Sequence, residues 1–295
     1  MIMAQSLFKL LKQKDNTVEI DVLAPSWSQL VVDRMPEINR NICLPIEHGQ
    51  FALQKRREVA AELRANNYDQ AIVLTNSWKS ALIPWLAKIP IRTGWLGEMR
   101  WGLLNDLRYL NKSVLSKMVQ RYVALGLAAK EPFPESFPMP KLNAPQDSVQ
   151  KALEKFQLHT TAPILALCPG AAFGPAKRWP EKYFIEIAQQ KLAAGWQIWL
   201  FGSQQDEPVV TAIQQQLKGD VTSFAGKLSL LETIDLLSVV KAVVANDSGL
   251  LHMAASLDIP VVGIYGSTTP NFSPPLSLKA QVLKENLPCS PCFKR

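Results

Sequence analysis

Residues 241–257, KAVVANDSGLLHMAASL, decide how the second half of this sequence is interpreted. Lys241–Ala245 is short, apolar and rich in β-branched residues, which is typical of a buried parallel strand. From Leu250 to Leu257 the apolar residues recur at helical spacing, so Asn246–Gly249 is expected to form the turn between a strand and a helix. A strand that passes directly into a helix through such a turn indicates an α/β fold.

This turn has the features of an anion-binding site. Asp247 or Ser248 could cap the helix, and Gly249 would let a ligand approach the backbone. The free N–H groups of Gly249 and Leu250 would lie at the helix N-terminus, where anions bind favourably. His252, one turn further on, would point to the same place. The alternatives are an ordinary capped turn and a partly buried histidine without a ligand.

Strands and helices alternate on both sides of this turn. Expected strands are 18–24, 42–44, 70–75, 91–94, 163–168, 197–201, 221–224, 241–245 and 260–264. Expected helices are 1–14, 27–35, 51–66, 79–87, 180–194, 207–217, 230–240 and 250–257. In the third of these helices, Arg56, Arg57 and Arg64 are expected on the solvent face. The pattern predicts two doubly wound, Rossmann-like α/β domains that face a cleft.

A proline-rich segment separates the two halves. Pro132, Pro134, Pro138, Pro140 and Pro145 cannot continue a helix or a central strand. We therefore expect an N-terminal domain at 1–130, a linker at 131–146 and a C-terminal domain at 147–295.

The composition is that of an ordinary globular protein, with 47% hydrophobic and 19% charged residues. No apolar run is long enough to span a membrane, and the start lacks the pattern of a signal peptide, which favours a cytoplasmic location. The formal net charge of +7 suits an acidic partner such as a nucleotide or a phosphorylated lipid head group. Cys289 and Cys292 have metal-type spacing, but no second pair follows them, and their role stays open.

A second informative loop is Cys168–Pro180, CPGAAFGPAKRWP, between an expected strand and an expected helix that would begin with Pro180. Gly170 and Gly174 would leave room for a ligand, while Lys177 and Arg178 bring two cations to the end of the sheet. Cations beside a helix N-terminus would bind a diphosphate and stabilise it as a leaving group. The alternative is a surface loop with solvated charges.

Three further turns carry polar candidates. Asp206 or Glu207, after the strand 197–201, could bind ribose hydroxyls or merely begin a helix. In the first half, the candidate acceptor-binding residues are Lys79, Arg92, Glu98 and Arg100, of which the two arginines would bind phosphate groups of an acceptor. A solvated loop is the alternative for these first-half residues.

Several motifs are missing from the sequence. The sequence contains no Asp-x-Asp pair, so it does not indicate a metal held by paired carboxylates. The sequence contains neither the phosphate-binding GxxxxGK[ST] loop of NTPases nor the GxSxG elbow of hydrolases. The sequence contains no basic helix interleaved with stacking aromatic residues, so it does not indicate nucleic-acid binding.

Three motifs in this order resemble the ADP-heptose glycosyltransferases of family 9. They are the loop Cys168–Pro180, the stretch Asn246–His252, and TGWLGEMR at Thr93–Arg100. The resemblance implies a GT-B fold and inverting transfer of L-glycero-D-manno-heptose from ADP-heptose to the first heptose of the lipopolysaccharide inner core. It implies no metal or separate cofactor, and work at the cytoplasmic face of the inner membrane.

The resemblance also implies roles for single residues. Lys177 would stabilise the departing diphosphate. Gly170, Asp206, Asp247, Ser248, Gly249, Leu250 and His252 would complete the sugar-nucleotide site. Family members place a general base in a Gly-Asp pair that would lie upstream of Met1, so this chain is expected to lack the first strand and the base, and also the C-terminal end. A non-catalytic ADP-binding or sugar-nucleotide-binding module and a heptosyltransferase with a different acceptor are the alternatives.

Overall fold

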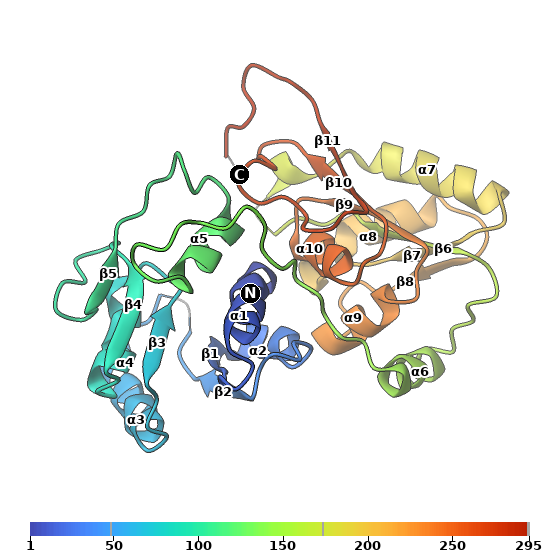
Figure 1. The fold of residues 1–295 in the computed structure, drawn as a ribbon. Coiled ribbons are helices and arrows are strands. Elements are labelled where there is room, and N and C mark those ends of the chain that lie inside the picture. Colours follow the sequence, from blue (N-terminus) through green and yellow to red (C-terminus); the bar gives the residue numbers. More distant parts are fainter. Residues whose placement is uncertain (48, 173, 294–295) are drawn as a thin grey trace. The chain divides into compact units, whose positions relative to one another are not determined.

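The computed structural model describes residues 1–47, 49–172 and 174–293 (Figure 1). The chain forms two compact units, one from Met3 to Pro138 and the other from Met139 onward. Residues 131–145, which contain this boundary, form neither helix nor strand.

The second unit is built on one six-stranded parallel sheet with the strand order β11-β10-β9-β6-β7-β8. Its strands are β6 (Ile164–Cys168), β7 (Gln197–Leu200), β8 (Val221–Ser223), β9 (Ala242–Asn246), β10 (Val261–Tyr265) and β11 (Ala280–Lys284). Its helices are α6 (Gln146–Lys155), η2 (Pro175–Lys177), α7 (Glu181–Ala193), η3 (Gln204–Asp206), α8 (Glu207–Gln215), α9 (Leu230–Leu237) and α10 (Gly249–Ser256). The chain runs outward from β6 to β8 and then returns to β9 on the other side of β6. The switch point of this doubly wound sheet therefore lies between β6 and β9.

Helices cover both faces of this sheet (Figure 1). Helices α7 and α8 pack on each other on one face, and α9 contacts both α6 and α10 on the other. Strand β6, with the sequence ILALC, is buried along its whole length, as expected for a central parallel strand. Phe184 of α7 and Ile213 of α8 are fully buried in the core with Leu167 and Leu200. This core fixes the ends of β6 and β9, and so the loops that follow them.

The first unit contains two separate parallel sheets, β1-β2 and β3-β4-β5. The strands are β1 (Asp21–Pro25), β2 (Arg40–Leu44), β3 (Gln70–Val73), β4 (Ile91–Trp95) and β5 (Asp106–Arg108). The helices are η1 (Ile2–Ala4), α1 (Gln5–Lys14), α2 (Ser26–Val32), α3 (Leu53–Arg64), α4 (Trp78–Leu86) and α5 (Met118–Leu125). None of the described helices in either unit is long and apolar enough to cross a membrane.

Some details differ from the prediction. The expected elements did not include β5, α5, α6 or β11. Pro180 precedes α7 as its N-cap, because its extended backbone (ψ 136°) places it outside the helix that begins at Glu181.

The expected solvent-facing position of Arg56 is wrong. Its side chain is 5% exposed, and its guanidinium donates to the carbonyls of Phe51 at 2.6 Å and Lys79 at 3.0 Å. Burial lowers the pKa of Arg56, but these carbonyl partners keep the charged group satisfied inside the unit.

Candidate functional site

The candidate site lies at the carboxyl edge of the six-stranded sheet, at the switch point between β6 and β9. The loop after β6 carries Lys177, and the turn after β9 carries Asp247. The Lys177 Nζ donates to the Asp247 Oδ2 at 2.8 Å, across 70 positions of sequence. Their side chains are only 16% and 8% exposed, so this pair is shielded from solvent. The two loops, which are far apart in sequence, thus form one site.

Asn246 holds these two loops together. Its amide nitrogen donates to the Pro169 carbonyl at 2.7 Å, and its amide oxygen accepts from the Trp179 backbone N–H at 3.0 Å. The side chain is completely buried. Because one amide contacts both ends of the loop after β6, the position of Lys177 relative to Asp247 is set by the backbone rather than by flexible side chains alone.

Thr268 is a third member of the site that sequence reasoning missed. Its hydroxyl donates to the same oxygen, Asp247 Oδ2, at 2.7 Å. The turn that carries it follows β10, and a Cβ on Gly266 would lie 3.1 Å from the Ala176 carbonyl oxygen, so this turn packs against η2. A strand followed by Gly266-Ser-Thr-Thr-Pro270 has the same strand-end pattern as the other loops and could have signalled it.

The N-terminus of α10 opens toward solvent at Gly249. Gly249 is exposed, and a Cβ there would meet nothing within 4 Å, so a ligand can reach the first N–H groups of the helix. The expected side-chain cap is wrong, because neither Asp247 nor Ser248 bonds to these N–H groups. Asp247 instead uses its carboxylate on Lys177 and Thr268, and the Ser248 Oγ is buried with no hydrogen-bond partner among the described residues. The helix end is therefore left available for an anion.

His252 lies one turn into α10, with its Nε2 3.9 Å from the Asp247 Oδ1. That distance is too long for a hydrogen bond. Burial lowers the pKa of His252 to about 4, although the Asp247 charge acts in the opposite direction. The imidazole is therefore neutral at pH 7, and it can offer a hydrogen bond to a ligand rather than a positive charge.

Gly170 and Asp206 have a structural relation that the sequence did not reveal. A Cβ on Gly170 would lie 2.2 Å from the Asp206 Cγ, so the space beside this glycine is filled by a carboxylate of the same chain. The Asp206 Oδ2 accepts from the Ser203 N–H at 3.0 Å and from the Ser203 hydroxyl at 2.7 Å. The expectation that Gly170 leaves room for a ligand is wrong. Both residues brace the edge of the site, and Asp206 is 8% exposed.

The first-unit candidates do not form a cluster of free cations. Arg100 is completely buried and donates to the carbonyls of Thr75 and Trp95, so its expected role as an exposed phosphate ligand is wrong. Burial, opposed by the nearby Glu98 charge, lowers the pKa of Arg100. Arg92 donates to the carbonyls of Leu103 at 2.7 Å and Ile89 at 2.6 Å.

The remaining two first-unit candidates lie nearer the surface. The Lys79 Nζ donates to the Gly49 carbonyl at 3.2 Å. The Glu98 Oε2 accepts from the Trp78 N–H at 3.1 Å at the start of α4. Of the four candidates, Lys79 is thus the cation best placed to meet a ligand.

Comparison with known proteins shows which family this chain belongs to. Residues 56–295 match the family described as glycosyltransferase family 9 (heptosyltransferase). The chain belongs to this family. It is 43% identical to lipopolysaccharide heptosyltransferase 2 of Salmonella typhimurium, over 96% of this chain and 84% of that protein. It is 44% identical to lipooligosaccharide heptosyltransferase 2 of Haemophilus influenzae, over 96% and 85% of the two chains.

A solved structure agrees with this assignment. The structure of Escherichia coli ADP-heptose lps heptosyltransferase II superimposes with a TM-score of 0.89 at 40% identity, covering 97% of this chain and 87% of that chain. The family 9 assignment and the two α/β units of the GT-B type therefore agree. The chain is a glycosyltransferase.

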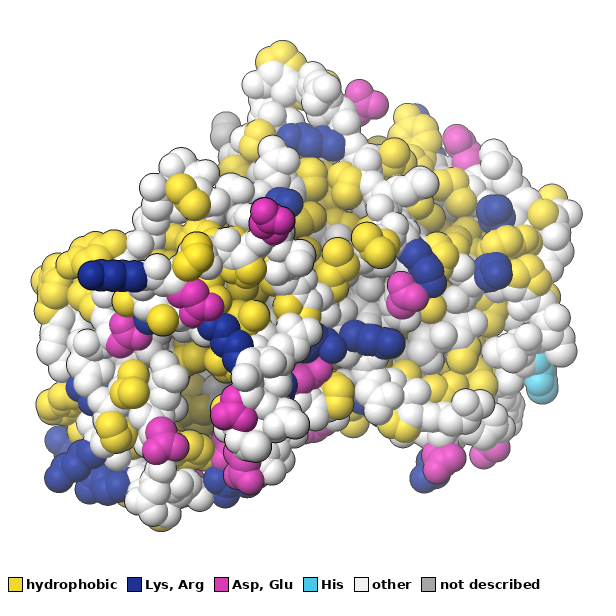
Figure 2. Space-filling view, viewed as in Figure 1, with side chains coloured by type: hydrophobic (Ala, Val, Ile, Leu, Met, Phe, Trp, Pro, Cys, Tyr) yellow, Lys and Arg dark blue, Asp and Glu magenta, His cyan; other side chains and the backbone are white. Residues whose placement is uncertain are grey.

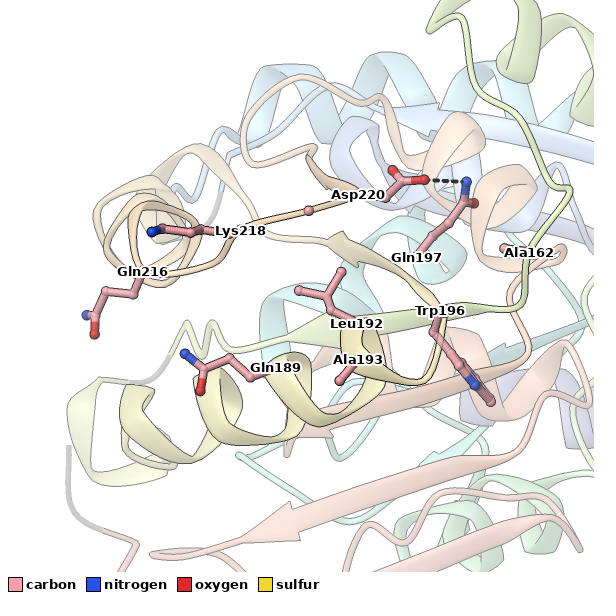
Figure 3. A pocket seen from close by; sticks show the side chains of 11 residues that line it. Ala162, Gln189, Leu192, Ala193, Trp196, Gln197, Gln216, Lys218 and Asp220 are labelled. Atoms are coloured by element: carbon pink, nitrogen blue, oxygen red, sulfur yellow. Dashed lines mark hydrogen bonds between the residues drawn. The ribbon is translucent and has the colours of Figure 1, made fainter.

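The second unit of this family 9 glycosyltransferase has a hollow of about 620 Å³ at the edge of its sheet opposite the candidate site (Figure 3). Leu192, Trp196 and Lys218 are among its lining residues, near the carboxyl ends of α7 and α8. The Gln197 side-chain amide nitrogen donates to the Asp220 Oδ2 there at 2.7 Å, a hydrogen bond drawn in Figure 3. Ligands of doubly wound sheets bind at the carboxyl ends of the strands, so we do not assign the sugar nucleotide to this hollow.

Proposed function

We propose that this family 9 glycosyltransferase moves L-glycero-D-manno-heptose from ADP-heptose to the first heptose of the lipopolysaccharide inner core, with inversion at the anomeric carbon. The observation that carries the proposal is the buried group formed by Lys177, Asp247 and Thr268 beside the open N-terminus of α10. The relatives named above act on heptose, and these residues suit a negatively charged nucleotide sugar.

The chemistry follows from where charge develops. As the acceptor hydroxyl oxygen bonds to the anomeric carbon, the bond from that carbon to the diphosphate oxygen breaks, and the hydroxyl proton passes to a general base or to water. Negative charge then grows on the departing ADP. Lys177 and the N-terminal N–H groups of α10 supply positive charge at this point, which favours the transition state more than the bound substrate. Because protein groups can neutralise the diphosphate, the proposal needs no metal ion.

Asp247 and His252 would contact the sugar. Lys177 and Thr268 both bond to Oδ2 of Asp247, so Oδ1 is the oxygen left to accept from a sugar hydroxyl. The neutral imidazole of His252 can donate or accept one further hydrogen bond. Ser248, Gly249 and Leu250 would contribute the helix N-terminus, while Asp206 would position the loop rather than reach the ribose.

The acceptor would bind to the first unit. Of the four candidates, Lys79, in the first turn of α4, and Glu98, in the loop after β4, remain able to contact it. Since the lipopolysaccharide core is attached to a lipid, the proposal places the chain peripherally at the cytoplasmic face of the inner membrane.

The experiment compares the unaltered protein with Lys177→Ala, using mass spectrometry for transfer and calorimetry for ADP-heptose binding. The variant should lower turnover by roughly 10²–10³-fold, while binding should weaken much less. Lys241→Ala is the control, because Lys241 is exposed and directly precedes the amino end of β9. If the unaltered protein binds ADP-heptose but transfers no heptose to any core acceptor, the chain is a sugar-nucleotide-binding module and the proposal is wrong.

A further inference from the structure

The first unit displays apolar side chains along one edge of its three-stranded sheet. Strands β3, β4 and β5 are parallel neighbours, so the segments that follow them emerge at the same edge. These segments carry five exposed apolar or aromatic side chains, which we call the aromatic edge: Trp78, Met99, Trp101, Tyr109 and Val114. Their exposed fractions range from 41% for Trp78 to 79% for Met99. Single exposed apolar residues are ordinary in proteins, but a group of them at one edge indicates an interaction surface.

The aromatic edge is displayed by a rigid scaffold. The buried guanidinium of Arg100 donates to carbonyls at the ends of both β3 and β4, those of Thr75 and Trp95. The Glu98 N–H donates to the Asn76 carbonyl at 3.2 Å, and the Glu98 carboxylate accepts from Trp78. These bonds tie the segment after β3 to the segment after β4. The backbone that carries Trp78, Met99 and Trp101 is therefore fixed by these bonds.

The apolar surface also continues inward. Tyr109 and Val114 line a hollow of about 240 Å³ whose other apolar walls include Trp95, Leu115 and Leu127. An apolar group that contacts the aromatic edge therefore has a place to enter the unit. On the side seen in Figure 2, hydrophobic side chains gather with a Lys or Arg side chain over the part of the first unit that contains β4 and β5.

The chemistry of the aromatic edge matches the surface of a lipid bilayer. Trp and Tyr combine an apolar ring with a polar N–H or O–H and favour the boundary between lipid and water. Lys112 and Lys117, both exposed, lie in the segment that also carries Tyr109 and Val114. Long lysine side chains beside aromatic rings are attracted to anionic lipid head groups. Aromatic and cationic groups on neighbouring loops thus favour an anionic membrane.

We propose that the aromatic edge binds the surface of an anionic lipid bilayer and inserts Trp101 and Tyr109 among the lipid head groups. This inference deepens the proposed function, because the proposed acceptor is carried by a lipid. It can nevertheless fail separately, since vesicle binding is measured without donor, acceptor or transfer.

The test measures flotation of the full chain with vesicles of phosphatidylcholine containing increasing phosphatidylglycerol. Binding should rise with phosphatidylglycerol and fall with added salt. Trp101→Ser combined with Tyr109→Ser should weaken vesicle binding by about tenfold or more. Trp85→Ser is the matched control: Trp85 is 45% exposed, but it lies at the other end of α4 from Trp78. Circular dichroism should show the same fold in all variants, because these side chains are at the surface.

Three results would overturn the inference. One is no binding to anionic vesicles, and a second is an equal loss in Trp85→Ser. The third is self-association of the chain that the double variant abolishes, which would assign the aromatic edge to a second copy. Transfer to a core acceptor stripped of its acyl chains should be unchanged in the double variant. A loss of that transfer would show that the edge binds acceptor sugars instead of lipid.

Discussion

Replacing Gly170 by alanine should destabilise the second unit through Asp206. A Cβ at position 170 would lie 2.2 Å from the Asp206 Cγ and 2.4 and 2.5 Å from the two carboxylate oxygens. No side chain tolerates such distances, so the carboxylate must move. Asp206 is short, and its Oδ2 is bound to both the N–H and the hydroxyl of Ser203. Moving the carboxylate therefore breaks both hydrogen bonds at the start of η3.

The size of the effect follows from those bonds. A hydrogen bond to a charged group contributes about 1.5–3 kcal/mol, and water can replace part of what is lost. We expect Gly170→Ala to cost about 3 kcal/mol. Asp206→Ala loses the same two bonds and also removes all three atoms that the new methyl group would meet first. The double variant should therefore cost about as much as Asp206→Ala alone, which gives a coupling energy of about 3 kcal/mol between the two positions.

The assay is hydrogen exchange read by mass spectrometry on peptides that contain β6 and β7, because it reports the free energy of opening of the second unit by itself. Gly249→Ala is the control, since a Cβ there meets nothing within 4 Å, and its effect should stay within about 1 kcal/mol. Strictly additive effects of the two substitutions, or a Gly170→Ala protein as protected as the unaltered one, would refute the reasoning.

Four further predictions concern stability, binding and reactivity. Arg56→Ala should destabilise the first unit by about 2–4 kcal/mol, because it removes a buried side chain whose guanidinium donates to the carbonyls of Phe51 and Lys79. Arg57→Ala, at an exposed position, should change the free energy of unfolding in urea by less than about 0.5 kcal/mol. Thr268→Val should weaken ADP-heptose binding about fivefold in calorimetry and Thr268→Ser should restore it, since only serine keeps the bond to the Asp247 carboxylate. The pKa of His252 is about 4 in the folded chain and 6.5 ordinarily, so the unfolded chain binds the proton at a higher pH than the folded chain does. The free energy of unfolding, measured in urea, should therefore fall as the pH drops from about 6.5 to 4. His252→Asn should make that free energy less dependent on pH in this range. Burial raises the pKa of the Cys168 thiol, whereas the other three cysteines are exposed. Iodoacetamide should therefore alkylate three cysteines of the native chain, and Cys168 only after denaturation. Rapid alkylation of Cys168 in the native chain would contradict this.

The sequence by itself determined the class of fold and the edge of the sheet that carries the site. Apolar segments such as Ile164–Cys168 and Ala242–Asn246 alternate with helical patterns, and such segments form parallel strands because both faces must be buried. Once the strands are parallel, the residues that follow them meet at one edge. Lys177, Asp247 and His252 could therefore be placed at that edge from local patterns alone. The three-residue strand Asp106–Arg108 was missed, because its sequence, DLR, has a charged residue on each side of a single apolar one and shows no apolar run.

Only the tertiary structure decided what each polar side chain contacts. Asp247 could have capped its helix, but the fold brings Lys177 and Thr268 to the same carboxylate oxygen from distant parts of the chain. The glycine at 170 was expected to make room for a ligand, and the fold fills that space with Asp206.

Arginines in similar local sequences can be buried or exposed, because their burial also depends on the tertiary structure. Arg56 and Arg57 are adjacent in one helix, yet the first is buried on backbone carbonyls and the second is exposed. Arg100 was expected at an exposed position, and it is buried because its guanidinium donates to the carbonyls of Thr75, after β3, and Trp95, at the end of β4. Periodicity records which face of an element is apolar. Which carbonyl or carboxylate lies within reach of a cation depends on the packing of segments far apart in sequence, and that packing exists only in the folded chain.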